Sequence, residues 1–263
     1  MRRHIAYDRL LARVFLDDPG GWVLKGGTGL LARIPGVARH TADVDLFRDM
    51  STLDIVGDLV TAGDNDLGDF FSFDIEKVTD LTGGTSGIRC RVVAYLGEKE
   101  FASFSIDVVT TTVMTREPDI LEPLLPIDLD GLTTVPYRTY PIVDHITDKL
   151  AAMVSLYANG APSSRYRDLV DLVLIATTQT VRAEELAIAL NSEFTSRGLD
   201  MPTRVELPSD DWINGYAAEA QNAPGFEILD VEDALPIVRA LLDPVLTGRA
   251  TGSWDPHRLA WLD

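Results

Sequence analysis

The hydrophobic pattern of this chain changes near residue 136, and this change limits the folds that are open to it. Before this point, runs with apolar residues at alternate positions predict strands at 71–75, 88–96 and 101–109. Beyond it, apolar residues recur at helical spacing and predict helices at about 142–157, 164–177, 182–196, 209–221 and 230–246. The sequence therefore predicts an α/β (α+β) fold, with a small mixed sheet domain at residues 1–135 followed by an α-helical bundle at residues 136–263.

Shorter elements complete the first half. We expect helices at about 5–16, 28–34 and 51–61, and a strand at 22–24. The strands at 88–96 and 101–109 are expected to form a hairpin through a turn at 97–100. The glycine-rich run 83–87 lies between two strands and is interpreted as a loop.

Composition excludes several classes of protein. The formal net charge of −18 over 263 residues opposes general nucleic-acid binding, so any contact with RNA must be local. The single cysteine, Cys90, fits a reducing compartment, and a strand position favours a packing role for it. With neither a signal peptide nor a run of 18 apolar residues, the chain is expected to be soluble and cytoplasmic, with no membrane partner.

Two acidic residues lie on one predicted strand. Asp43 and Asp45 alternate with Val44 and Leu46, so their side chains share one face. Carboxylates about 7 Å apart, on a strand that rises roughly 3.3 Å per residue, can converge on two divalent cations about 4 Å apart. A bare Asp-x-Asp in an acidic protein is also typical of a solvent-facing strand edge, but the sequence around it favours a metal site.

The first of these surrounding features is a glycine turn. Gly26, Gly27 and Thr28 precede the short helix expected at 28–34. Small residues there allow backbone N–H groups and the helix N-terminus to approach a triphosphate closely. Further along, Asp107 lies among apolar residues and is a natural third metal carboxylate if its strand neighbours the first one.

The last motifs lie in the helical half. Lys149, one of only four lysines, begins a Lys-Leu-Ala-Ala run. A second run follows from residue 165, containing Arg165, Arg167, Asp168 and Asp171. Each run alone is more typical of an amphipathic helix with surface salt bridges.

In this order, the motifs resemble the AbiEii/MenT-type nucleotidyltransferases of the DNA polymerase β-like superfamily, usually the toxins of toxin–antitoxin systems. The resemblance covers about residues 22–175. Gly26, Gly27, Asp43 and Asp45 match the family's first motif. Its later motifs are matched by a second set of residues, Lys149, Arg165, Arg167, Asp168 and Asp171. Thr28 departs mildly from the serine common in the superfamily but keeps the hydroxyl.

The resemblance implies in-line attack of an acceptor hydroxyl on the α-phosphate of a nucleoside triphosphate. Asp43, Asp45 and Asp107 would hold Mg²⁺ or Mn²⁺, and the glycine turn with Arg165 and Arg167 would bind the nucleotide. Lys149 would contact the triphosphate and Asp168 would orient Lys149 or a nearby arginine.

The resemblance also implies partners. The acceptor would be RNA, specifically the 3′ end of tRNA, whose modification would block translation. A cognate antitoxin would restrain the enzyme by binding it or by modifying a hydroxyl, for which Thr41 is the candidate because it lies two positions before Asp43.

Two other functions are compatible with the same residues. One is a small-molecule nucleotidyltransferase of the aminoglycoside-modifying kind, since an acidic surface suits a cationic substrate. The other is a non-catalytic nucleotide-binding protein, which the intact Asp43, Asp45 and Lys149 disfavour.

Overall fold

The computed structural model describes residues 2–36, 41–49, 52–81, 86–124, 131–157 and 160–263. The chain forms two compact units. The first comprises the described parts of Met1–Pro35, Thr41–Thr112 and Pro118–Tyr140, and the second joins Val113–Glu117 to the helices after Pro141. The mixed α/β class expected from the sequence is confirmed.

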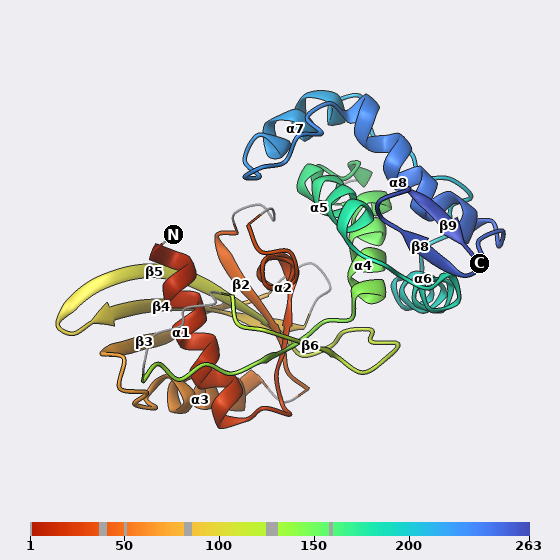
Figure 1. The fold of residues 1–263 in the computed structure, drawn as a ribbon. Helices are drawn as coiled ribbons and strands as arrows, with labels where there is room; N and C mark the ends of the chain where they lie inside the picture. The colour runs from red at the N-terminus through yellow and green to blue at the C-terminus, as the bar shows by residue number, and fades with distance from the viewer. Residues whose placement is uncertain (1, 37–40, 50–51, 82–85, 125–130, 158–159) are drawn as a thin grey trace. The chain divides into compact units, whose positions relative to one another are not determined.

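A mixed seven-stranded sheet organises the first unit (Figure 1). Its order is β3-β4-β5-β2-β1-β7-β6. The pairs β2/β5 and β1/β7 are parallel, and the other neighbours are antiparallel. The strand bounds are Val23–Lys25 (β1), Asp43–Phe47 (β2), Phe71–Asp80 (β3), Gly87–Leu96 (β4), Lys99–Val109 (β5), Asp119–Leu121 (β6) and Tyr137–Thr139 (β7).

One face of this sheet is covered and the other carries the polar side chains. Helices α1 (Arg2–Asp17) and α3 (Thr52–Gly63) pack on the covered face, where α1 crosses the sheet in Figure 1. The ring of Tyr7 on α1 lies 4.7 Å from that of Phe104 on β5. Apolar residues of β2, β4 and β5 line this face, namely Val44, Leu46, Ile88, Cys90, Val92, Phe104, Ile106 and Val108. The alternation that buries them places the residues between them on the opposite face.

The second unit is helical. Its bounds are Ile142–Val154 (α4), Tyr166–Thr178 (α5), Ala183–Arg197 (α6), Trp212–Ala220 (α7) and Val231–Leu246 (α8). Helix α4 packs on α5 and α6, while α5 also contacts α7 and α8. All five helices expected from the sequence are present, because each has an apolar stripe that a neighbouring helix buries.

Several local expectations differ from the structure. Helix α2 spans Gly26–Arg33, so it begins at the two glycines and not after them. The β4–β5 turn is shorter than expected, because β5 already begins at Lys99. The sequence did not predict β6, β7 or the hairpin of β8 (Ser253–Asp255) and β9 (Ala260–Leu262), whose three-residue strands are too short to show a period. Ser51 and residues 83–85 lie outside the described residues.

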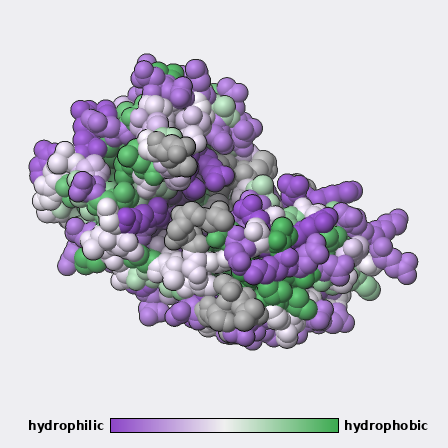
Figure 2. All heavy atoms as spheres, turned by 180° about the vertical axis from the view of Figure 1, so that it is seen from behind, coloured by the Kyte–Doolittle hydropathy of each residue, from purple (hydrophilic) through white to green (hydrophobic). Residues whose placement is uncertain are grey.

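Hydrophilic residues dominate the face of the molecule shown in Figure 2, and hydrophobic ones form small patches between them. Among the described helices, none combines the length and apolar character that a membrane span requires.

Candidate active site

The junction between β1 and α2 places a backbone directly against an acidic side chain. Gly26 has a φ of +56°, in the left-handed region that glycine adopts readily. A Cβ atom at this position would lie 1.8 Å from Asp45 Oδ2, closer than any two such atoms approach. Glycine is therefore required twice, for its backbone angle and for the space that the carboxylate of Asp45 occupies.

Three hydroxyl groups hold the start of β2. The hydroxyl of Thr28, which is buried, donates to the carbonyl oxygen of Asp43 at 2.9 Å, and Thr41 donates to the same oxygen at 3.0 Å. Tyr7 donates to the carbonyl oxygen of Ala42 at 2.8 Å. The hydroxyl of Thr28 thus fixes the strand that carries the acidic pair, a contact within the protein that the sequence did not reveal. Its expected contact with a nucleotide stays a prediction.

The acidic residues of β2 and β5 lie side by side. Val44 and Leu46 are buried, while Asp43 and Asp45 are partly exposed on the open face of the sheet. In the parallel β2/β5 register, Asp45 is opposite Asp107. The condition attached to Asp107, that its strand neighbours that of Asp45, is confirmed. Its role as a metal ligand stays a prediction.

Arg89 on β4 holds the carboxylate of Asp107. It is the register partner of Asp107, and its Nε and one terminal nitrogen donate to the two carboxylate oxygens at 2.6 Å each. This hydrogen bonding, with the negative charges of Asp107, Asp43 and Asp45, raises the pKa of Arg89 above its ordinary value. The sheet therefore holds three carboxylates within the electrostatic reach of one guanidinium.

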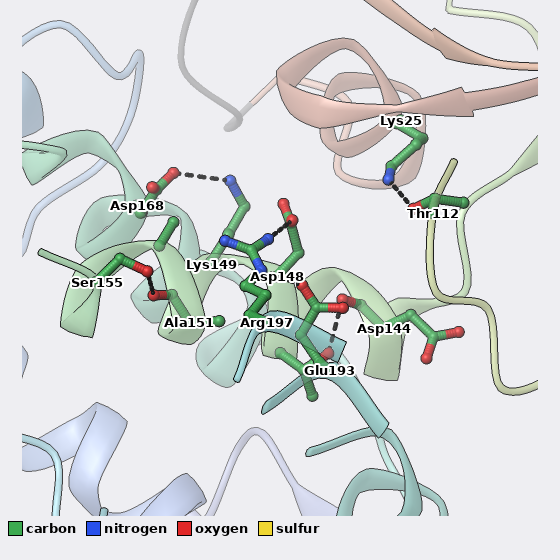
Figure 3. A network of polar contacts seen from close by, with 12 residues as sticks. Lys25, Thr112, Asp144, Asp148, Lys149, Ala151, Ser155, Asp168, Glu193 and Arg197 are labelled. Atoms are coloured by element: carbon green, nitrogen blue, oxygen red, sulfur yellow. Dashed lines mark hydrogen bonds and ion pairs between the residues drawn. The ribbon is translucent and has the colours of Figure 1, made fainter. Parts of the chain in front are cut away.

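Asp45 has Asp107 of β5 on one side, and on the other side its register partner is Lys25, at the end of β1. The ammonium group of Lys25 contacts the hydroxyl of Thr112 (Figure 3). It also lies 4.0 Å from the centre of the Tyr140 ring. These contacts keep a second cation next to the acidic row.

The donor set fits a hard divalent cation. Within the described ranges, no group of three or more His, Cys, Asp or Glu side chains is placed to hold a metal ion on its own. Magnesium is commonly bound by one or two carboxylates together with substrate phosphates. Asp43 and Asp45 supply such a pair, beside the α2 N-terminus, whose N–H groups favour anions.

The second unit contains a buried charge cluster. Lys149 on α4 is only 4% exposed, and its ammonium group donates to Asp171 at 2.5 Å and to Asp168 at 3.3 Å. Figure 3 shows Lys149 pointing from α4 toward Asp168 on α5. Arg165 donates to Asp168 at 2.5 Å through its Nε. Asp168 therefore contacts both the lysine and the arginine that the sequence placed around it.

Two opposing effects act on Asp168. Burial raises the pKa of its carboxyl, but the positive charges of Lys149 and Arg165 outweigh burial and hold this pKa below its ordinary value. Arg165, just before α5, is 38% exposed, and Arg167 in the first turn of α5 is exposed. The cluster thus joins a buried lysine, paired with two carboxylates, to arginines that reach solvent.

The expected site residues therefore form two groups, one in each unit. The sheet unit holds Gly26, Gly27, Thr28, Asp43, Asp45 and Asp107, and the helical unit holds Lys149, Arg165, Arg167 and Asp168. Sequence reasoning missed Arg89, which only the β4/β5 register places beside Asp107. It did not give Asp171 a role either, although a carboxylate three residues after Asp168 faces the same way on a helix.

Comparisons with known proteins show the family and the fold. Residues 9–238 match the family model described as nucleotidyl transferase AbiEii toxin, type IV TA system. The fold is similar to that of JHP933 from Helicobacter pylori (TM-score 0.55, 19% identity, 95% of each chain). It is also similar to that of MenT4, a nucleotidyltransferase toxin of Mycobacterium tuberculosis (TM-score 0.55, 18% identity, 99% of this chain and 87% of that one). No curated protein matches the sequence.

The family match identifies this chain as a nucleotidyltransferase enzyme. The protein belongs to the AbiEii family of nucleotidyl transferase toxins, as the order of its motifs indicated. A toxin of a type IV system has a cognate antitoxin, so this chain has a partner of that kind.

Proposed function

We propose that this toxin uses Mg²⁺ or Mn²⁺ to transfer a nucleotide from a nucleoside triphosphate to the 3′ end of tRNA, and so blocks translation. The observation that carries the proposal is the pair Asp43 and Asp45 on the open face of β2, of which Asp45 lies against the glycine backbone that begins α2. Such a pair beside a helix N-terminus meets the two requirements of phosphoryl transfer, charge stabilisation and positioning.

The residues divide the chemistry between them. Asp43 and Asp45 bind the divalent ions, which when bound lower the pKa of the attacking hydroxyl and neutralise the departing pyrophosphate. The N–H groups at the start of α2 orient the triphosphate. The Asp45 carboxylate is held in place by its packing against Gly26, which limits the loss of side-chain entropy on binding.

The helical unit supplies positive charge. We propose that Lys149 acts in the same reaction, with Asp168 and Asp171 fixing its position. Arg165 and Arg167 are exposed enough to contact phosphates, and they provide the local cationic surface that RNA binding requires on a chain of net charge −18. Contacts between these arginines and RNA phosphates release counterions, so RNA binding, and with it the rate of transfer to RNA, should fall as the salt concentration is raised.

Labelling identifies the reaction and its acceptor. The protein is incubated with each α-labelled nucleoside triphosphate and total RNA, with and without Mg²⁺, and in parallel with an aminoglycoside in place of RNA. We expect Mg²⁺-dependent label on tRNA that is lost when the 3′ nucleotides are removed. Label on the aminoglycoside alone would identify a drug-modifying enzyme, and no Mg²⁺-dependent label in any arm would indicate a nucleotide-binding protein without turnover.

We also propose that the antitoxin acts at Thr41. Its hydroxyl oxygen bonds to the backbone of Asp43, so a phosphate there would add about two negative charges next to the metal carboxylates. Expressed in a bacterium, wild-type protein and Thr41→Val should arrest growth, whereas Thr41→Glu and Asp43→Ala should not. Growth arrest by Thr41→Glu equal to that of Thr41→Val would contradict this mode of restraint.

A further inference from the structure

Arg89 and Arg91 lie on the same face of β4, and each is opposite a residue of β5. Arg89 and Arg91 are two residues apart on one strand, so both side chains lie on the open face of the sheet. Across β5, Arg89 is opposite Asp107, and beyond Asp107 lies Asp45. The neighbouring row has Arg91, then Ser105, then Asp43. The two rows differ at the middle position, which is a carboxylate in one and a hydroxyl in the other.

The partners of the two arginines differ accordingly. Arg89 makes a bidentate bond with Asp107, whose side chain is 17% exposed. Arg91 is 57% exposed, and its ion pair with Glu76 on β3 has an N–O distance of 3.8 Å. A bidentate guanidinium–carboxylate bond fixes both oxygens of the acid, whereas a long, exposed pair contributes little. Arg89 therefore determines what the third carboxylate of the site can do.

We propose that Arg89 is a positioning residue that withholds Asp107 from divalent cations in the nucleotide-free enzyme, so that metal binds mainly together with the triphosphate. This inference rests on the proposed metal-dependent function. With both oxygens of Asp107 bonded to Arg89, the two carboxylates of β2 are left as the cation ligands, and the guanidinium charge repels a second cation. Triphosphate oxygens then complete the coordination.

Binding of Mn²⁺, measured by the electron paramagnetic resonance signal of the free ion at low ionic strength, tests this directly. The variants are Arg89→Met, the matched control Arg91→Met, and Arg89→Met combined with Asp107→Asn. Without nucleotide, Arg89→Met should bind Mn²⁺ about tenfold more tightly than wild type, because one positive charge is removed and one carboxylate is released. Arg91→Met should change affinity less than about twofold, since its charge is screened by solvent.

Two further results are expected. The double variant should return to an affinity near that of wild type, because the released carboxylate is gone. With a non-hydrolysable triphosphate present, the difference between wild type and Arg89→Met should shrink. A damaged fold would weaken metal binding, so tighter binding cannot come from misfolding.

The outcomes separate this inference from the proposed function. If Mn²⁺ binding is lost in the Asp43→Ala, Asp45→Ala variant but Arg89→Met matches Arg91→Met, the role of Arg89 is overturned and the metal site stands. If the Asp43→Ala, Asp45→Ala variant binds Mn²⁺ as wild type does, the metal site itself is overturned.

Discussion

The carboxylates of the sheet and those of the helical unit differ in how cations balance them. On β2 and β5, Asp43, Asp45 and Asp107 are partly exposed, and the bidentate guanidinium of Arg89 bonds to one of the three. In the helical unit, Asp168 and Asp171 are buried, and each contacts the ammonium group of Lys149. A partly exposed carboxylate can exchange its contacts for a bound cation, while a buried carboxylate must be paired, because an uncompensated buried charge is costly.

Removing the acidic pair should have the largest effect on the reaction. We expect Asp43→Ala with Asp45→Ala to lower nucleotidyl transfer by at least about 10³-fold, since metal-assisted charge stabilisation is worth several kcal/mol. The melting temperature of the metal-free protein should stay the same or rise, because two like charges are removed. Transfer is measured with labelled triphosphate, and Glu98→Ala in the exposed β4–β5 turn is the control. More than about a tenth of wild-type transfer in the double variant would exclude these ligands.

Removing the buried lysine should lower stability as well as nucleotidyl transfer. Lys149→Ala leaves Asp168 and Asp171 buried without their ammonium partner, which costs about 3–5 kcal/mol in free energy of unfolding. Lys149→Arg should recover only part of this, because a planar guanidinium does not fit where a compact ammonium sits. Urea unfolding measures both variants beside Lys99→Ala, an exposed lysine that should change stability by less than about 0.5 kcal/mol. Unchanged stability and turnover in Lys149→Ala would overturn both the energetic importance of the buried pairs and the proposed role of Lys149 in the reaction.

Two glycine substitutions sharpen the contrast between a functional and an ordinary helix position. Gly26→Ala should lose about 1–3 kcal/mol of stability through its left-handed backbone, and should lose activity because its Cβ displaces Asp45. Gly57 lies inside α3 with open space around its Cβ position, so Gly57→Ala should gain about 0.5–1 kcal/mol. Thermal unfolding and transfer assays measure the pair. Equal behaviour of the two variants would show that the contact with Asp45 is dispensable.

The smallest effect is expected in the pH dependence of stability. The pKa of Asp168 is lowered in the folded protein, so its contribution is complete above the unfolded value of about 4 and is lost as pH falls through the folded pKa. Asp168→Asn cannot titrate, so below about pH 4 it should lose stability less steeply than wild type. Urea midpoints between pH 2.5 and 6 give both curves. Parallel curves over this range would mean that Asp168 is not coupled to the lysine.

Local sequence patterns anticipated the parts of the site that depend on nearby residues. The alternation around Asp43 and Asp45 predicted a shared face, and the i,i+3 spacing of Arg165 and Asp168 fits the ion pair that the structure contains. The five helices followed from their apolar stripes. Each of these features is set by chain geometry over a few residues.

The remaining features depend on pairing between distant segments. The parallel pairing of β2 with β5 brings residues 45 and 107 together, although two other strands lie between them in the sequence. No local signal encodes that register. The β4/β5 register decides that Arg89, and not Arg91, lies opposite Asp107. The sequence did not predict that Lys149 is buried either. The pattern of an amphipathic helix is the same whether its lysine faces solvent or two aspartates.

Cys90 allows the opening of β4, the strand that also carries Arg89, to be measured without an added label. It is the only cysteine of the chain, it is fully buried on β4, and burial raises the pKa of its thiol to about 11. A thiol in this state reacts with an alkylating agent only during moments when the strand opens to water, and its reaction rate then reports the equilibrium between closed and open forms. The alkylation rate of Cys90 thus measures how often β4 opens to solvent. A ligand that stabilises the closed sheet would lower this rate.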